Sequence, residues 1–198
     1  MSLFLDIGKG AGLASASGVR PFLPPLLAGA LARGNIGINF DRTDYHFLET
    51  PAFLAAVLAL AVLAYAVDRG RGARRPEGRD PLALGLAAVA LALGALLFAG
   101  SLAGGHHEGW PGLIAGVACA ALGYAAVAAL FGRARRRLEG SGAASLLDVY
   151  ADGIALALAG LSIALPPVGI AGVVAFVVLI VRARGGGERK YEGLRVLR

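Results

Sequence analysis

The chain has 198 residues, of which 57% are hydrophobic and only 16% are charged. Soluble domains contain about 25% charged residues, so this composition excludes an ordinary soluble protein and predicts an integral membrane protein. The formal net charge is +6, but the basic residues are distributed over several loops rather than on one face. We therefore expect no nucleic-acid partner.

Six segments with few or no charges are each close to the ~20 residues that cross a bilayer as a helix. They are Ala11–Ala32, Pro51–Val67, Pro81–Gly104, Pro111–Gly132, Leu146–Pro166 and Pro167–Val181. We therefore predict an all-α fold, a polytopic integral membrane bundle of about six transmembrane helices. The chain would divide into a first three-helix half (1–104), a second three-helix half (105–184) and a tail (185–198).

The first of these segments contains Arg20 where only hydrocarbon is expected, with ten uncharged residues before it and twelve after it. A guanidinium at mid-bilayer costs about 3 kcal/mol on insertion scales and more in simulations, so it needs a partner. Pro21, Pro24 and Pro25 break the helix beside it, and such backbone must be buried in protein or face water. The pattern predicts a polar site inside the bundle.

The loop of residues 33–50 follows the first segment. Its ligand-type side chains are Asp41, Asp44, His46 and Glu49. They lack the paired spacing of a zinc or calcium loop, and the adjacent His106 and His107 cannot both point from one helix face at one site. We favour solvated loops here, and expect no metal and no other cofactor.

The start of the fifth segment supplies the acidic partner for Arg20. Asp148 and Asp152 are four residues apart and share one helix face. At 1.5 Å per residue from Ser145, Asp152 lies about 10 Å into the span. We predict an ion pair of Arg20 with Asp152 before Asp148, with added hydrogen bonds from Ser15, Ser17 or freed backbone carbonyls. The polar site, for substrate or for structure, comprises Arg20, Asp152, Asp148, Glu49 and Tyr124.

Basic residues fall on alternate loops. With Lys9, sixteen lie on one side of the predicted membrane, while Arg33 and Arg42 lie on the other and Arg20 lies within a span. The positive-inside rule then places both termini in the cytoplasm of a multi-pass protein of the inner (plasma) membrane. Anionic lipids are expected partners of the cytoplasmic arginine clusters.

A short internal similarity relates the two halves. An apolar pair followed by a carboxylate occurs at Phe47-Leu-Glu49 before the second span and at Leu146-Leu-Asp148 at the start of the fifth. Three spans per half would give the halves opposite orientations, as in the inverted repeats of secondary transporters. Chance similarity between Ala/Leu-rich helices explains the match about equally well.

The segment Gly18-Val-Arg20-Pro-Phe22-Leu23-Pro24 resembles the bacterial membrane protein family catalogued as domain of unknown function 4126. In that family a Gly-Leu-Arg-x-Phe-Leu-Pro segment lies in the first helix, and Val19 here replaces the leucine. The resemblance extends over most of residues 8–182 and implies several spans and an acidic residue opening a late helix. It carries over Arg20 and Pro24, but no reaction is assigned to the family.

Three functions remain open from the sequence. In a small transporter or permease, Arg20 with Asp152 or Asp148 would bind a small anion or couple to protons. A lipid-phosphate handling protein, flippase or enzyme, would use Arg20 as a phosphate ligand, whereas a noncatalytic scaffold would use the pair only to fix helix packing. No Ser/His/Asp set, metal-ligand cluster or phosphate loop occurs within the spans, so we do not expect an enzyme. The lipid bilayer is the expected partner, and a homo-oligomer is compatible with this interpretation.

Overall fold

The computed structural model describes residues 2–71, 81–138 and 144–185, and within these ranges the protein is all-helical. Its helices are α1 (Leu3–Val19), α2 (Leu23–Arg33), the short 3-10 helix η1 (His46–Glu49), α3 (Pro51–Arg71), α4 (Pro81–Gly104), α5 (Trp110–Leu138), α6 (Ala144–Ala164) and α7 (Pro166–Gly185). In the described ranges, three stretches are long and apolar enough to cross a membrane: Leu82–Gly104, Trp110–Leu130 and Pro166–Ala183. They indicate a membrane protein.

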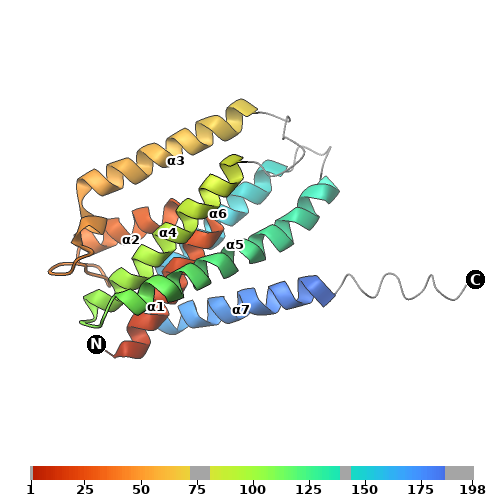
Figure 1. Cartoon of the computed structure of the whole chain (residues 1–198). Helices are drawn as coiled ribbons and strands as arrows, with labels where there is room; N and C mark the ends of the chain where they lie inside the picture. The colour runs from red at the N-terminus through yellow and green to blue at the C-terminus, as the bar shows by residue number, and fades with distance from the viewer. Residues whose placement is uncertain (1, 72–80, 139–143, 186–198) are drawn as a thin grey trace, which may run out of the picture.

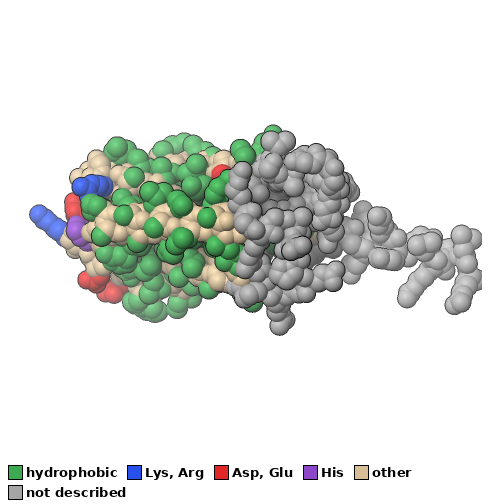
Figure 2. All heavy atoms as spheres, turned by 90° about the horizontal axis from the view of Figure 1, so that it is seen from above, with side chains coloured by type: hydrophobic (Ala, Val, Ile, Leu, Met, Phe, Trp, Pro, Cys, Tyr) green, Lys and Arg blue, Asp and Glu red, His purple; other side chains and the backbone are tan. Residues whose placement is uncertain are grey.

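The bundle has two distinct ends (Figure 1). One end, here called the loop end, holds the start of α1, the segment 34–50, the connection between α4 and α5 and the turn between α6 and α7. The other, the far end, holds the last turns of α3, α5 and α7. Figure 2 shows hydrophobic side chains along the helices, whereas charged side chains and a histidine gather at the loop end. This distribution suits helices that lie in hydrocarbon and a loop end that meets water.

The expectation of a single first span is wrong. The segment Ala11–Ala32 is divided between α1 and α2, and α2 returns toward the end from which α1 started. Contacts at the loop end establish this path, because the Lys9 ammonium donates a hydrogen bond to the carbonyl of Gly37 over 2.7 Å. The start of α1 and the end of α7 consequently lie at opposite ends of the bundle, whereas six spans would place them at the same end.

The other five expected spans each coincide with one helix, α3 to α7. Because the α1–α2 hairpin begins and ends at the loop end, α3 and α5 both start from that end. The two halves therefore enter the bundle from the same end, and the argument for an inverted repeat loses its basis. The halves also interlock, since α1 packs against α4 of its own half and against α5, α6 and α7 of the other. Of the expected tail, residues 186–198 lie outside the described part of the chain.

Helix α1 is the centre of the bundle because its side chains are small. It is buried along nearly its whole length. A Cβ added at Gly10 would lie 2.9 Å from the Phe98 ring of α4, and one added at Gly12 would lie 2.9 Å from the Gly169 Cα of α7. Such close approach of backbones is how transmembrane helices gain packing energy, since burial from lipid supplies little.

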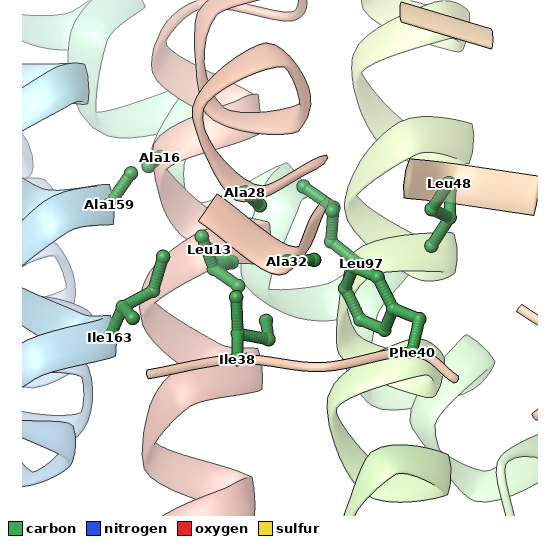
Figure 3. Packing of buried hydrophobic residues seen from close by; sticks show 10 residues of the cluster. All are labelled: Leu13, Ala16, Ala28, Ala32, Ile38, Phe40, Leu48, Leu97, Ala159 and Ile163. Atoms are coloured by element: carbon green, nitrogen blue, oxygen red, sulfur yellow. The ribbon is translucent and has the colours of Figure 1, made fainter. Parts of the chain in front are cut away.

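The segment between α2 and η1 is folded into the bundle rather than solvated throughout (Figure 3). Phe40 and Leu48 are almost completely buried, and they pack with Leu13 of α1, Ala32 of α2 and Leu97 of α4. The expectation of a wholly solvated loop is therefore wrong. These two anchors hold the polar residues between them in a fixed position.

Candidate functional site

The break between α1 and α2 is dictated locally by the Arg20-Pro21 step. A residue before proline is disfavoured in the helical region, and Arg20 is extended, with φ −142° and ψ 114°. Its N–H still donates to the carbonyl of Ala16 over 3.0 Å, which completes the last turn of α1. Of the three expected helix breakers, Pro21 lies in the break, whereas Pro24 and Pro25 are buried in the first turn of α2, where proline is tolerated.

Arg20 reaches Asp152 on α6 from this break. The Arg20 Nε lies 2.6 Å from the Asp152 Oδ1, and the side chains are 31% and 46% exposed, respectively. The pair is thus joined but not enclosed by protein. Beside it, Val19 packs with Ala151 of α6 and Phe176 of α7 in an apolar cluster. An ion pair with an apolar wall on one side feels a lower dielectric than one in bulk water.

The depth of the pair follows from helix length. Asp152 lies twelve residues before the last residue of α6, Ala164, which is about 18 Å from the loop end at 1.5 Å per residue. Arg20 lies seventeen residues after Leu3, which is about 25 Å. A bilayer core is about 30 Å thick, so both residues lie within hydrocarbon depth if the loop end meets one surface.

The other expected members of this site are not gathered around Arg20. Ser15 and Ser17 donate within α1, to the carbonyls of Gly12 and Leu13, so they do not provide the expected hydrogen bonds to the guanidinium. The phenol of Tyr124 is half exposed on α5, and no hydrogen bond joins it to another described residue. The side chain of Asp148 lies outside the described residues.

Glu49 belongs to a second site at the loop end, separated from Arg20 by the length of α2. Its Oε1 lies 3.3 Å from the His46 Nε2, which is 3.9 Å from the Asp41 Oδ1. Burial raises the pKa of Glu49, and the nearby Asp41 carboxylate raises it further. A cavity of about 240 Å³ adjoins the three side chains, and Arg33, Asn35 and Thr50 also line it.

The sequence shows no paired metal-ligand spacing in this loop, but the structure brings three of its ligand-type side chains together. Asp41, His46 and Glu49 each offer a ligand atom, and these atoms lie within 4.8 Å of one another. The signal that the sequence offered is the three-residue spacing of His46 and Glu49, because side chains at i and i+3 eclipse in a 3-10 helix. Asp41 joins them only through the path of the intervening chain.

A third polar group, which the sequence analysis missed, fixes the start of α1. Asp6 and Lys9 are buried at 2% and 6% exposure. The Ser101 hydroxyl of α4 donates to the backbone carbonyl of Asp6 over 2.8 Å, and the His107 Nε2 lies 3.7 Å from the Asp6 Oδ2. One turn apart on a helix, Asp6 and Lys9 could have been recognised as a charged face.

Comparison with known proteins gives no match to this chain among family models, curated proteins or solved structures, so the resemblance to the domain of unknown function 4126 family stays a prediction.

Proposed function

We propose that the protein is a small permease of the inner membrane, in which Arg20 and Asp152 form the site for a small anion and a proton. The observation that carries this proposal is the ion pair at the break of the α1–α2 hairpin, 2.6 Å long and open on one side. Transporters place their substrate sites at discontinuous helices near the bilayer midplane, where ionisable residues are otherwise too costly to retain.

The chemistry of the pair suggests a coupled cycle. While Asp152 is ionised it occupies the guanidinium of Arg20 and excludes other anions. A proton on Asp152 removes that negative charge and weakens its attraction to the guanidinium, so that a small anion can compete for a planar pair of its N–H donors. One proton and one singly charged anion would then cross together without net movement of charge, whereas a dianion would need two protons for the same balance. Arg20 is the main anion ligand in this scheme, because Pro24 and Pro25 remove two backbone donors from the first turn of α2.

The proposed orientation places the far end in the cytoplasm. The sequence segments that follow α3, α5 and α7 contain most of the basic residues, and the segments at the loop end contain few. In this orientation the N-terminus is outside, because the start of α1 lies at the loop end. Anionic lipids would interact with the basic segments.

Transport in proteoliposomes tests the proposal. We expect uptake of one of chloride, phosphate or succinate that is driven by an inward proton gradient, with a pH-sensitive dye reporting the accompanying protons. Arg20→Gln should abolish uptake, whereas Asp152→Asn, which mimics the protonated carboxyl, should allow anion movement that no longer carries protons. Asp44→Asn, at an exposed carboxylate of the loop end, is the matched control and should behave as wild type.

The alternatives lead to different results in the same vesicles. Movement of a labelled phospholipid between leaflets that is lost in Arg20→Gln, without anion uptake, would favour a lipid-phosphate function. No transport of either kind would contradict the permease proposal and leave the scaffold. In that case thermal stability would still measure the interaction between Arg20 and Asp152. Each single alanine variant should be less stable than wild type, and the double variant should lose about 1 kcal/mol less than the sum of the two single losses. This value is small because both side chains are partly exposed.

A further inference from the structure

The cluster at Asp41, His46 and Glu49 contains a buried carboxylate that is only partly compensated. Glu49 is 7% exposed, and its Oε2 has no hydrogen-bond partner among the described residues. The carboxylate of Asp41 lies beside it, within 4.8 Å of the same group of atoms. Burying a carboxylate is costly unless a cation or several donors compensate it, and a second carboxylate increases that cost.

No lysine or arginine of the described chain provides this compensation. Neither Asp41 nor Glu49 lies within 4.0 Å of such a group, and the described ion pairs of both carboxylates go to His46 alone. A single imidazole, neutral or protonated, balances at most one of the two negative charges. The cluster of Asp41, His46 and Glu49 therefore carries a negative charge that a divalent cation would neutralise.

The distances suit a transition metal in tetrahedral coordination. Zinc binds histidine nitrogen and carboxylate oxygen at about 2.0–2.2 Å, which at the tetrahedral angle places two ligand atoms roughly 3.3–3.6 Å apart. The His46 Nε2 to Glu49 Oε1 distance of 3.3 Å falls in this range. The 3.9 Å from Nε2 to the Asp41 Oδ1 is a few tenths longer. The Asp41 side chain is 55% exposed, and its Oδ2 accepts a hydrogen bond from the Asn39 amide over 3.3 Å, so a small rotation would close the gap.

The backbone on both sides of the cluster is fixed. Phe40 precedes Asp41 in the sequence and Leu48 precedes Glu49, and both are buried in the core. Their burial holds the backbone of Asp41 and Glu49 in a fixed position. His46 and Glu49 project together from η1. The adjoining cavity of about 240 Å³ leaves room for a metal-bound water, whose share of liquid volume is about 30 Å³.

We propose that Asp41, His46 and Glu49 form a zinc-type metal site at the loop end, with water in the fourth position. The imidazole ligand favours zinc and related transition metals over Mg²⁺ and Ca²⁺, which prefer all-oxygen sites. The metal would tie the segment before η1 to η1 itself, and α3 packs mainly against η1 and α2. Zinc would thereby stabilise the attachment of α3 to the bundle, independently of any transport through Arg20.

Metal binding by the purified, tag-free protein in detergent tests the site directly. After removal of metal with EDTA, titration with Zn²⁺ alone should give one ion per chain, and an equal concentration of Mg²⁺ should not bind. His46→Ala and Glu49→Gln should each weaken zinc binding by at least the roughly 10- to 100-fold that loss of an outer-shell partner costs. His46 is exposed, so its replacement should leave the fold intact.

Two matched controls separate this site from adventitious binding. Asp44→Asn and His106→Ala remove an exposed carboxylate and an exposed imidazole from the same end of the molecule and should leave zinc affinity unchanged. Zinc should also raise the thermal midpoint of the wild type and of both controls, but not of Glu49→Gln. Absence of a stoichiometric ion would overturn the proposal, as would zinc binding that survives in His46→Ala and Glu49→Gln.

Discussion

The contact between α4 and α5 allows a quantitative test of packing in the bundle. Gly116 of α5 faces α4 so closely that an added Cβ would lie 2.6 Å from the Ala95 Cα, 2.7 Å from the Gly94 carbonyl oxygen and 2.9 Å from the Phe98 Cβ. Carbon atoms prefer separations of about 3.5–4.0 Å, so the two helices would have to move apart by roughly 1 Å in Gly116→Ala. Two of the three obstacles are backbone atoms, which cannot turn away.

The expected cost follows from the steric term. Overpacking of this kind costs about 1–3 kcal/mol. The substitution also gains up to about 1 kcal/mol of helix propensity, which would mask part of the effect. Gly85→Ala on α4 is the matched control, because no atom lies within 4 Å of its added Cβ, so it has the same propensity gain without the clash. We expect Gly116→Ala to be less stable than Gly85→Ala by about 1–3 kcal/mol, or roughly 2–12 °C in thermal midpoint.

The assay is the fraction of folded monomer that remains on size exclusion after heating in detergent. Helical content at room temperature should be equal in the two variants, which would show that both fold before heating. Equal midpoints for Gly116→Ala and Gly85→Ala would refute the reasoning, because the close α4–α5 contact would then carry no energy. A second substitution at the facing position of α4 should not restore stability, because α4 presents backbone atoms to Gly116 there.

Two further predictions concern the loop end. The pKa of Glu49 is raised first by burial and then by Asp41. In metal-free protein, the stability that this carboxyl contributes is therefore fully present below its ordinary pKa of 4.5. That stability is lost as the pH rises through the raised pKa. The stability of Glu49→Gln relative to wild type should therefore increase across that window in EDTA, and a difference that stays constant with pH would count against it. In a Cys119→Ala background, an impermeant maleimide should label cysteines at Ser2 and His106 from the same side and one at position 74 from the other; labelling of Ser2 together with position 74 would contradict the hairpin.

The sequence by itself determined the class of the protein and most of its helices. Long apolar runs specify helices in a membrane whatever their neighbours are, because backbone hydrogen bonds must be satisfied within each span. This is why α4 begins and ends where its apolar run does. A guanidinium in hydrocarbon is costly, so the sequence also predicted that Arg20 pairs with a carboxylate at similar depth. In the structure Arg20 lies beside Asp152.

The tertiary structure decided what happens after the break at Arg20. Proline at 21 ends a helix, but a chain that continues across the membrane and one that turns back obey the same local rules. Packing makes the difference: the small residues of α1 let four helices surround it, which leaves α2 on the outside of α1 and directs it back to the loop end. The positive-inside count could not detect this reversal, because only Lys9 changes side.

The same limit applies to the groups at the loop end. Asp41, His46 and Glu49 come together because Phe40 and Leu48 are buried on either side of the turn, and Lys9 is matched by a backbone carbonyl 28 residues away. Hydrophobicity and helical period are properties of neighbouring residues, whereas these contacts depend on the path of the whole chain. Local pattern therefore determined the helices and their composition, and only their packing against one another determined the direction of the first pair and the position of the candidate metal ligands.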